Sequence, residues 1–446
     1  MGTFKLNYQL LLKPFLLALA VLFTFMACSE DQNILQDNAI SESETESAKA
    51  SILNPETGHS FDGFDGPVFD IAALPNGGIL VADHVVDDVK DGEGNVIEII
   101  NADAVIKEIG NRGVREITSH PMVIGSGAFG APDNTFINGL EPIGNGNFFA
   151  TRSGLDLGVG AALFRTTRGN ERMVGDIESF TLGDWQEEGE GEPGQNPSWK
   201  NFECEPPGGF SAGPHTNPYH LTALSGSEVL IADAAGNSLL HATTNGNIEV
   251  VAYFPPVVDP DTQEQLVQFW IDDDGDMVLF NNNLEIECPV EPVPTAVAVG
   301  DDGAYYVGEL TGTTNENWLG GPTPEGLASI WRVEAGSRDV NCPSDACTKV
   351  LTGLNSVIDI EFGPDGYLYL VEYEKNGFLG TVTDFGIPLA GGAVKKCDLD
   401  SDNCEIIEGG VSFEDLPIPG AITFDKWDNL WLLDNVFAPT VRTIDW

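Results

Sequence analysis

Basic residues are scarce in this sequence. Among 446 residues, 20 Lys and Arg stand against 70 Asp and Glu, which gives a formal net charge of −50. An acidic excess of this size disfavours nucleic acid and anionic membrane surfaces as partners. The sequence also lacks long stretches with helical periodicity, a nucleophile elbow, a phosphate-binding glycine loop and an HExxH motif. It therefore predicts neither a helical protein nor any of the enzyme classes that those motifs mark.

The N-terminus carries a long apolar run, residues 14–26, which follows two lysines. Residues 1–27 are therefore predicted to be a signal peptide rather than a membrane span. Cys28 stands where a lipoprotein signal places the lipidated cysteine, and ordinary secretion without lipidation is the alternative. Residues 28–50 are polar and acidic and are predicted to form a disordered tether. The acidic start of this tether resembles a Bacteroidetes-type export signal. We therefore expect an outer-membrane lipoprotein that faces the periplasm or the cell surface. It is expected to contact the membrane only through its lipid anchor.

A repeated unit organises the rest of the chain, and residues 294–312 show it most clearly. A buried strand, a turn with Gly303 and a second strand are followed by an acidic residue, Glu309. The unit recurs with the turn residue at nearly the same distance from its end, which is typical of a propeller or a solenoid. The six units end on Asp83, Arg152, Asp233, Glu309, Glu372 and Asp434.

Third and fourth strands can be recognised after most units, for example at residues 238–244 and 247–254. Four antiparallel strands per repeat describe a propeller blade. We therefore predict an all-β protein, a six-bladed β-propeller of four-stranded antiparallel blades over residues 51–446, with insertions at about 183–213 and 255–292. The second insertion contains a segment that imitates the repeat, so seven blades is the alternative. The spacing is too short for a full blade, which favours an inserted hairpin.

The last blade has only three strands before the chain stops at Trp446. A closed propeller leaves no open edge there, so we expect the N-terminal side to supply the missing outer strand, near residues 50–54. In the first blade, we expect the two outer strands near residues 95–100 and 103–109.

Six cysteines remain besides Cys28. An even number in an exported chain predicts disulfides, and the spacing of paired zinc ligands is absent. The predicted pairs are Cys342–Cys347, Cys397–Cys404 and Cys204–Cys288.

Asp70, His220 and Asp359 occupy equivalent positions in three of the units, on the innermost strand that lines the central channel. Carboxylates brought together by the ring repel one another unless a cation lies among them. We therefore predict that these three residues bind a metal ion, with Ca²⁺ as the expected cofactor because hard cations prefer carboxylate oxygens.

The residues that end the second strands form a second ring of like charge, with Arg152 as its single basic member. One hypothesis is that Arg152, Asp233, Glu309, Glu372 and Asp434 hold a cationic or polyhydroxy ligand over the channel mouth. The alternative is that each acid accepts backbone N–H groups of its own turn.

Three stretches, residues 217–237, 293–312 and 358–372, resemble the ScyD/ScyE family of exported propeller proteins, named for the scytonemin sunscreen gene cluster of cyanobacteria. The resemblance covers residues 66–446 and implies a periplasmic or surface propeller, but no defined activity. Asn217 and Asn237 lie in these motifs and are added to the ligand-binding candidates. His220 stands where the family's NPYDL-type motif has Asp.

Two functions are therefore predicted as alternatives. The first is a monomeric lipoprotein that binds a small-molecule or surface ligand at the channel mouth through a divalent cation. The second is a metal-dependent propeller enzyme, either a lactonase-like hydrolase or a catalyst of oxidative coupling, and it rests mainly on fold analogy. Its metal ligands or general bases would be Asp70, His220, Asp233, Glu309 and Asp359.

Overall fold

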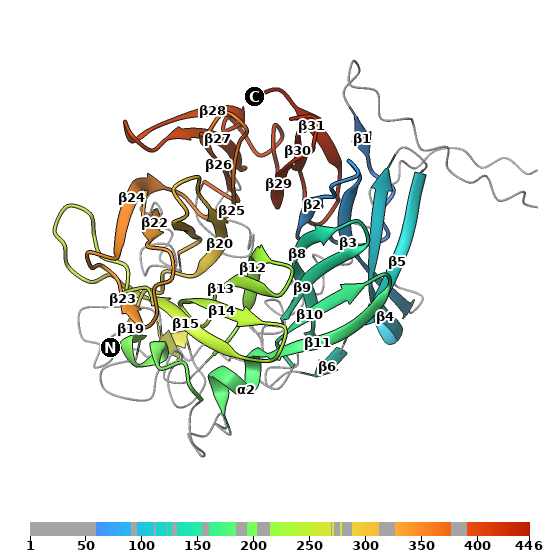
Figure 1. The fold of residues 1–446 in the computed structure, drawn as a ribbon, viewed down its shortest axis with the longest axis horizontal. Coiled ribbons are helices and arrows are strands. Elements are labelled where there is room, and N and C mark those ends of the chain that lie inside the picture. The colour runs from blue at the N-terminus through green and yellow to red at the C-terminus, as the bar shows by residue number, and fades with distance from the viewer. Residues whose placement is uncertain are drawn as a thin grey trace, which may run out of the picture.

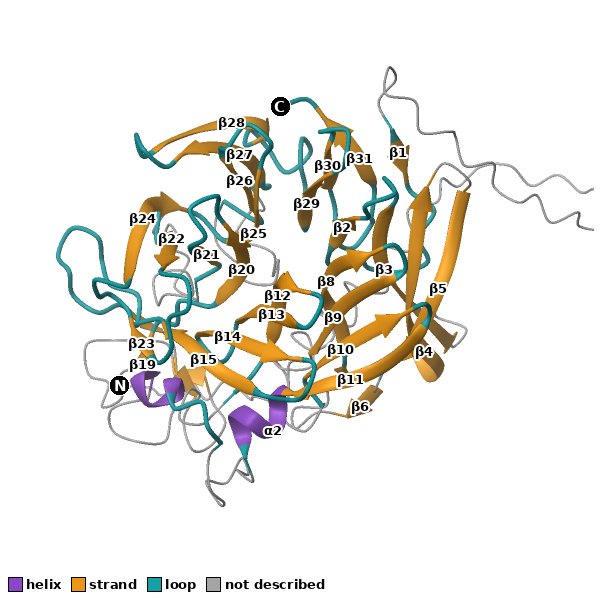
Figure 2. Ribbon diagram, in the orientation of Figure 1, coloured by secondary structure: helices purple, strands orange, loops and turns teal. Residues whose placement is uncertain are grey.

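The computed structural model describes the main part of the chain from His59 onward. The described residues are 59–90, 96–110, 113–122, 124–126, 132–153, 160–183, 194–202, 215–268, 270–271, 277–278, 288–311, 326–375 and 390–446. Within them nearly all regular structure is β-strand (Figure 2), which confirms the all-β prediction. The predicted signal peptide, Cys28 and the tether lie outside the described residues. No described helix has the length and apolar character needed to cross a membrane.

Six four-stranded antiparallel blades surround a central axis (Figure 1), which confirms six blades and shows that the seven-blade alternative was wrong. Blades 1 and 2 consist of β2 (Ile71–Ala73), β3 (Ile79–Lys90), β4 (Val96–Gly110) and β5 (Gly113–Pro121), then β8 (Phe136–Gly144), β9 (Asn147–Ser153), β10 (Ala162–Thr167) and β11 (Asn170–Asp176). Blades 3 and 4 consist of β12 (Pro218–Ser225), β13 (Glu228–Asp233), β14 (Ser238–Thr243) and β15 (Ile248–Tyr253), then β20 (Pro294–Val299), β21 (Tyr305–Glu309), β22 (Ala328–Val333) and β24 (Cys347–Leu354). Blades 5 and 6 consist of β25 (Val357–Phe362), β26 (Leu368–Glu372), β27 (Ala393–Asp398) and β28 (Asn403–Gly409), then β29 (Ala421–Phe424), β30 (Leu430–Leu433), β31 (Val441–Ile444) and β1 (Ser60–Phe61). The first strand of each blade lies nearest the axis in Figure 1.

Several short elements lie outside the blade pattern. They are β6 (Ile124–Ser126), β7 (Pro132–Asn134), α2 (Ile177–Leu182), η1 (Ser198–Phe202), β16 (Val267–Gln268), β17 (Trp270–Ile271), β18 (Met277–Val278), β19 (Cys288–Pro289) and β23 (Val340–Asn341). Within the part of this insertion that the structure describes, the segment that imitates the repeat forms a two-stranded pair, β17 with β18, in agreement with the predicted inserted hairpin. β23 comes from blade 4 but pairs in parallel with β15 and so ties blade 4 to blade 3.

The turn between the first two strands follows one design in several blades. Gly303 has φ 78°, a left-handed conformation that a residue with a Cβ rarely adopts. The Asp302 carboxylate accepts a hydrogen bond from the Ala304 N–H at 3.0 Å. Asp365 and Gly366 repeat this arrangement in blade 5. In blades 4 and 5 the Asp and Gly that mark the repeat in the sequence are therefore the residues that close the hairpin.

The hydrophobic core lies between adjacent blades rather than in one central mass. Successive residues of a strand point to opposite faces, so Leu80 packs toward blade 2 while Ile79 and Val81 pack toward blade 6. This explains why the second strands read as continuous apolar runs. Buried pairs across the six junctions are Leu80 with Phe148, Phe149 with Leu221, Leu230 with Val307, Ile330 with Leu370, Val371 with Leu432, and Trp431 with Ile79.

The ring closes through the N-terminal side of the chain, as predicted, but not at residues 50–54. β1 pairs antiparallel with β31, with Ser60 opposite Arg442 and Phe61 opposite Val441. Because β1 lies shortly before β2 in the sequence, only a short segment connects this closing strand to blade 1. A second correction concerns blade 1, where residues 96–110 form one long third strand and the fourth strand is β5.

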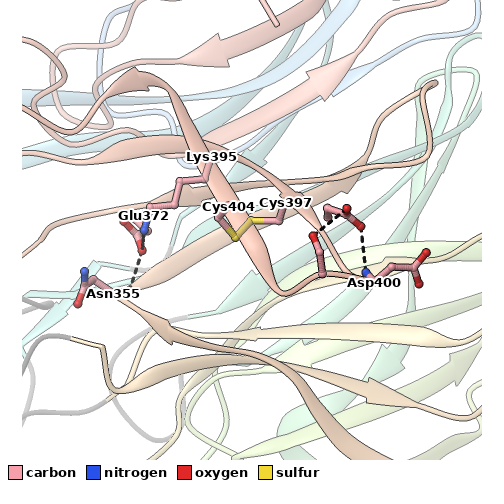
Figure 3. The surroundings of a disulfide bond; sticks show 8 residues. Asn355, Glu372, Lys395, Cys397, Asp400 and Cys404 are labelled. Carbon is pink, nitrogen blue, oxygen red and sulfur yellow. Dashed lines mark hydrogen bonds and ion pairs between the residues drawn. A yellow bond between two sulfur atoms is a disulfide. The ribbon is translucent and has the colours of Figure 1, made fainter.

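Two of the three predicted disulfides are confirmed. Cys342–Cys347 joins the residue that follows β23 to the first residue of β24, and Cys397–Cys404 joins β27 to β28 (Figure 3). Cys204 and the side chain of Cys288 lie outside the described residues, so their pairing stays a prediction. Disulfides persist in oxidising compartments, which agrees with an exported protein.

Candidate metal centre at the propeller axis

Asp70, His220 and Asp359 come from the first strands of blades 1, 3 and 5. Asp70 directly precedes β2, His220 lies in β12 and Asp359 lies in β25. In blade 5 the strand register pairs Asp359 with Val371, the residue just before the unit-ending Glu372. In blades 2, 4 and 6 the same position is held by the small residues Gly139, Ala296 and Ala421. Large polar side chains therefore alternate with small ones around the axis, which leaves room for three side chains to meet there.

The three polar side chains do meet. Each offers one possible ligand atom, and these atoms lie within 4.8 Å of one another. His220 Nε2 lies 3.3 Å from an oxygen of Asp359, Oδ1, and 3.9 Å from Oδ1 of Asp70. The aspartate side chains are 2% exposed and that of His220 is 16% exposed. Among the described residues this is the one group of three or more His, Cys, Asp and Glu side chains close enough to hold an ion.

Each aspartate is oriented by the blade that follows it. Asp70 Oδ2 accepts a hydrogen bond from the Leu140 N–H at 2.6 Å, and Asp359 Oδ2 accepts one from the Ile422 N–H at 2.8 Å. Leu140 and Ile422 directly follow the small residues of blades 2 and 6. The same inter-blade bond thus holds both carboxylates and directs each Oδ1 toward His220.

Two buried polar atoms of this group have no hydrogen-bond partner among the described residues: Asp70 Oδ1 and His220 Nδ1. Burial is the main cause that raises the pKa of Asp70 to about 7; His220 opposes this rise and Asp359 adds to it. An unpaired buried carboxylate oxygen is costly, and a cation placed beside it removes that cost.

Two further carboxylates line the same strands and were missed in the sequence. Glu141 and Glu361 lie two positions beyond Gly139 and Asp359, on the same side of their strands. Glu141 accepts a hydrogen bond from the backbone of Ala223, and Glu361 accepts one from the Phe424 N–H at 3.2 Å. Burial raises the pKa of Glu141 to about 8 and that of Glu361 well above its ordinary value. Both glutamates could have been found in the sequence by counting two residues onward from Gly139 and Asp359, because alternate residues of a strand lie on the same side.

Replacing Glu141 with Gln is expected to flatten the pH dependence of stability. Because the native state raises the pKa of Glu141, it binds this proton more tightly than the unfolded chain does. The stabilisation is complete at acidic pH and is lost as pH rises from about 4.3, the unfolded value, to about 8. In metal-stripped protein, Glu141→Gln should match the wild type near pH 4 and be a few kcal/mol more stable near pH 8, by urea unfolding. The exposed residue Glu116 provides the control, and the free energy of unfolding of Glu116→Gln should equal that of the wild type at every pH. If the free energy of unfolding of Glu141→Gln also equals that of the wild type at every pH, the burial assigned to Glu141 is contradicted.

Three of the acids that end the repeat units in the sequence are tied into their own blades. Asp83, Asp233 and Glu372 each accept a backbone N–H from the segment that precedes the first strand of the same blade. The donors are Gly66 at 3.0 Å, Asn217 at 2.6 Å and Asn355 at 2.8 Å. Side-chain partners complete the set: Lys107 binds Asp83, Thr216 Oγ1 donates to Asp233, and Lys395 binds Glu372 (Figure 3). Asp83 and Glu372 thus accept from the segment before the first strand, rather than from the turn where the alternative placed the donors. Asp233 accepts from both, because the Gly236 N–H of its own turn also donates to it at 3.0 Å.

The other ring candidates also have partners. Arg152 donates two hydrogen bonds to the carbonyl of Gly160, Asp434 accepts one from Arg442 at 3.0 Å, and Glu309 accepts one from Trp331 Nε1. Burial raises the pKa of Glu309 to about 7, and its Oε2 has no hydrogen-bond partner among the described residues. The side chains of Asn217 and Asn237 accept from Asn138 Nδ2 and the Val293 N–H. A ligand role for these residues stays a prediction.

No protein-family model matches the chain, and no curated protein matches it. Solved structures do resemble it. A streptogramin B lyase is 11% identical with a TM-score of 0.38, over 87% of this chain and 96% of that one. A gluconolactonase from Xanthomonas campestris is 11% identical with a TM-score of 0.38, over 87% and 89% of the two chains. A PQQ-bound aldose sugar dehydrogenase from Streptomyces coelicolor is 10% identical with a TM-score of 0.41, over 87% and 99%. Likeness this distant transfers neither ligand nor reaction, and the propeller assignment rests on the six sheets themselves.

Proposed function

We propose that this protein is a metal-binding β-propeller in which Asp70, His220 and Asp359 hold a divalent cation on the axis and present it to a ligand at the channel mouth. The observation that carries the proposal is the buried Oδ1 of Asp70, which faces His220 and has no hydrogen-bond partner among the described residues. Asp70 and Asp359 each accept a hydrogen bond from a backbone N–H of the next blade. Metal ligands in proteins are commonly oriented by hydrogen bonds of this kind.

A protonated His220 is the competing explanation for the cluster. At the separations in the structure an imidazolium lies within hydrogen-bond distance of Asp359 Oδ1 but not of Asp70 Oδ1, which it leaves without a partner. A divalent cation balances both, and neutral His220 then serves as the third ligand. His220 Nε2 lies 3.3 Å from Asp359 Oδ1 and 3.9 Å from Asp70 Oδ1. Small rotations of the three side chains would therefore bring these atoms around one ion.

The donor set indicates which ion. Ca²⁺, the ion expected from the carboxylates, prefers six to eight oxygen ligands, and one imidazole with two carboxylates suits Zn²⁺ or Mn²⁺ better. Three protein ligands also leave coordination positions open for a ligand or a water molecule. This openness favours the second candidate function, a metal-dependent enzyme, in its hydrolytic form, because a lactonase-like hydrolase needs a metal-bound water. Oxidative coupling would require a redox-active metal instead.

Location and family belong to the same proposal. We propose an exported monomer, lipidated at Cys28 and attached to the outer membrane, and the two disulfides support export. Kinship with the ScyD/ScyE family rests on the sequence motifs; residues 294–312, its most specific block, include the hairpin β20–β21. Neither nucleic acid nor a second protein is part of the proposed function.

Calorimetric titration of the mature, chelator-stripped protein tests this function. We expect one tight site for Zn²⁺ or Mn²⁺ and distinctly weaker binding of Ca²⁺. Several weak sites with no preference among the three ions would instead identify the carboxylates as ordinary acidic surface.

A further inference from the structure

A second set of residues converges at the axis together with the metal site. Phe69, Tyr219 and Ile358 directly precede Asp70, His220 and Asp359 in the chain. We call these three residues the collar. Because the first strand of each blade begins at the channel mouth and runs away from it, the collar lies on the mouth side of the metal site.

The collar is apolar and continuous. Ile358 is a buried member of one hydrophobic cluster, and Phe69 and Tyr219 are partly buried and pack against that cluster. The same cluster includes Leu310 from blade 4 and Tyr373 from blade 5. Most members of this cluster belong to the junction of blades 5 and 6, and Tyr219 of blade 3 reaches the cluster near the axis, beside Asp70 and Asp359. A ligand that approaches the ion from the mouth therefore passes apolar and aromatic side chains.

Tyr219 adds a hydrogen-bond donor to this apolar setting. Its side chain lies near Asp70, Asp359 and Tyr373. A phenol donates through its O–H and is stable in an aromatic environment. Tyr219 is thus placed to donate to an oxygen bound at the metal.

The charges around the mouth disfavour an anionic ligand. The chain carries a net charge of −50, and Glu141 and Glu361 lie on the strands that line the channel. Arg152, the basic member of the ring, donates to the carbonyl of Gly160 and lies over the Phe164 ring at 4.9 Å. It is thus engaged within its own blade and is not available to pair with an anion at the axis.

We propose that the ligand is a neutral molecule with an apolar body and a metal-binding oxygen group, that the collar holds its body, and that the Tyr219 hydroxyl donates a hydrogen bond to its oxygen. This proposal rests on the metal site proposed above. It deepens that function by naming the chemical class of the ligand and a residue that selects it.

Hydroxamic acids are suitable probes because they bind metals through oxygen and are neutral near pH 7. With zinc-loaded mature protein in a calorimeter, benzohydroxamic acid should bind about tenfold tighter than acetohydroxamic acid, because its ring is buried against the collar. A benzohydroxamic acid that carries an added para-carboxylate should lose this advantage. Tyr219→Phe should weaken benzohydroxamic acid binding about fivefold, and Tyr219→Ala should remove its preference over acetohydroxamic acid. Neither substitution should change the affinity for zinc itself.

Two failures are distinguishable. If zinc does not bind the wild type, the metal site and the ligand proposal are both overturned. If zinc binds but the two hydroxamic acids bind equally, or the preference persists in Tyr219→Ala, the metal site stands and the ligand proposal is overturned.

Discussion

Replacing Asp359 with Asn should weaken zinc binding by at least about 100-fold and leave the propeller folded. The amide removes the negative charge that the ion requires. It still offers an oxygen to the Ile422 N–H, so the bond between blades 5 and 6 survives. The measurements are calorimetric zinc titration and thermal unfolding of the same metal-stripped preparation.

Asp434→Asn is the matched control for this substitution. Asp434 directly follows the second strand of blade 6, and its carboxylate accepts a hydrogen bond from Arg442. Its substitution should leave zinc affinity unchanged within about twofold. Equal losses from both substitutions would mean that zinc binds diffusely to acidic groups, and no loss from Asp359→Asn would remove this residue from the site.

Replacing Asp233 with Ala should lower the free energy of unfolding by about 3 kcal/mol. The buried carboxylate accepts three hydrogen bonds, from Thr216 Oγ1 at 2.8 Å, the Asn217 N–H at 2.6 Å and the Gly236 N–H at 3.0 Å. Alanine leaves these donors unpaired, two of them in the segment that leads into β12 and one in the turn after β13. Urea unfolding at neutral pH measures the loss, and zinc titration shows whether the axis is affected.

Glu228→Ala on the same strand is the control, because Glu228 is exposed at the other end of β13. It should change stability by less than about 0.5 kcal/mol. If Asp233→Ala keeps its full stability and instead loses a ligand or the metal, the second-strand acids form a binding ring and the capping explanation is wrong.

The fold followed from the sequence because the repeat is local. Strand, turn and strand alternate within each unit, and the Asp and Gly at the turn make the hairpin visible without tertiary information. The same regularity placed Asp70, His220 and Asp359 in phase. Their metal role remains a prediction, but their convergence at the axis is a consequence of ring geometry that the period of the repeat already implied.

The parts that were mispredicted or missed depend on contacts between distant segments. The closing strand is only two residues long, and β31 selects Ser60 and Phe61 through pairing that no local pattern marks. The hydrogen-bond partners of Asp83, Asp233 and Glu372 could not be predicted either, because only the tertiary structure brings the donor N–H groups next to these acids. Glu141 and Tyr219 attract no notice as single residues; they gain importance from lying next to the axis.

Anomalous X-ray diffraction from zinc-soaked crystals of the mature protein tests the central claim most directly. Data collected on either side of the zinc absorption edge locate the ion without assumptions about its ligands. We predict one strong peak on the propeller axis, about 2.0–2.2 Å from Asp70 Oδ1, His220 Nε2 and Asp359 Oδ1. An empty axis, with peaks only at surface carboxylates, would contradict the claim.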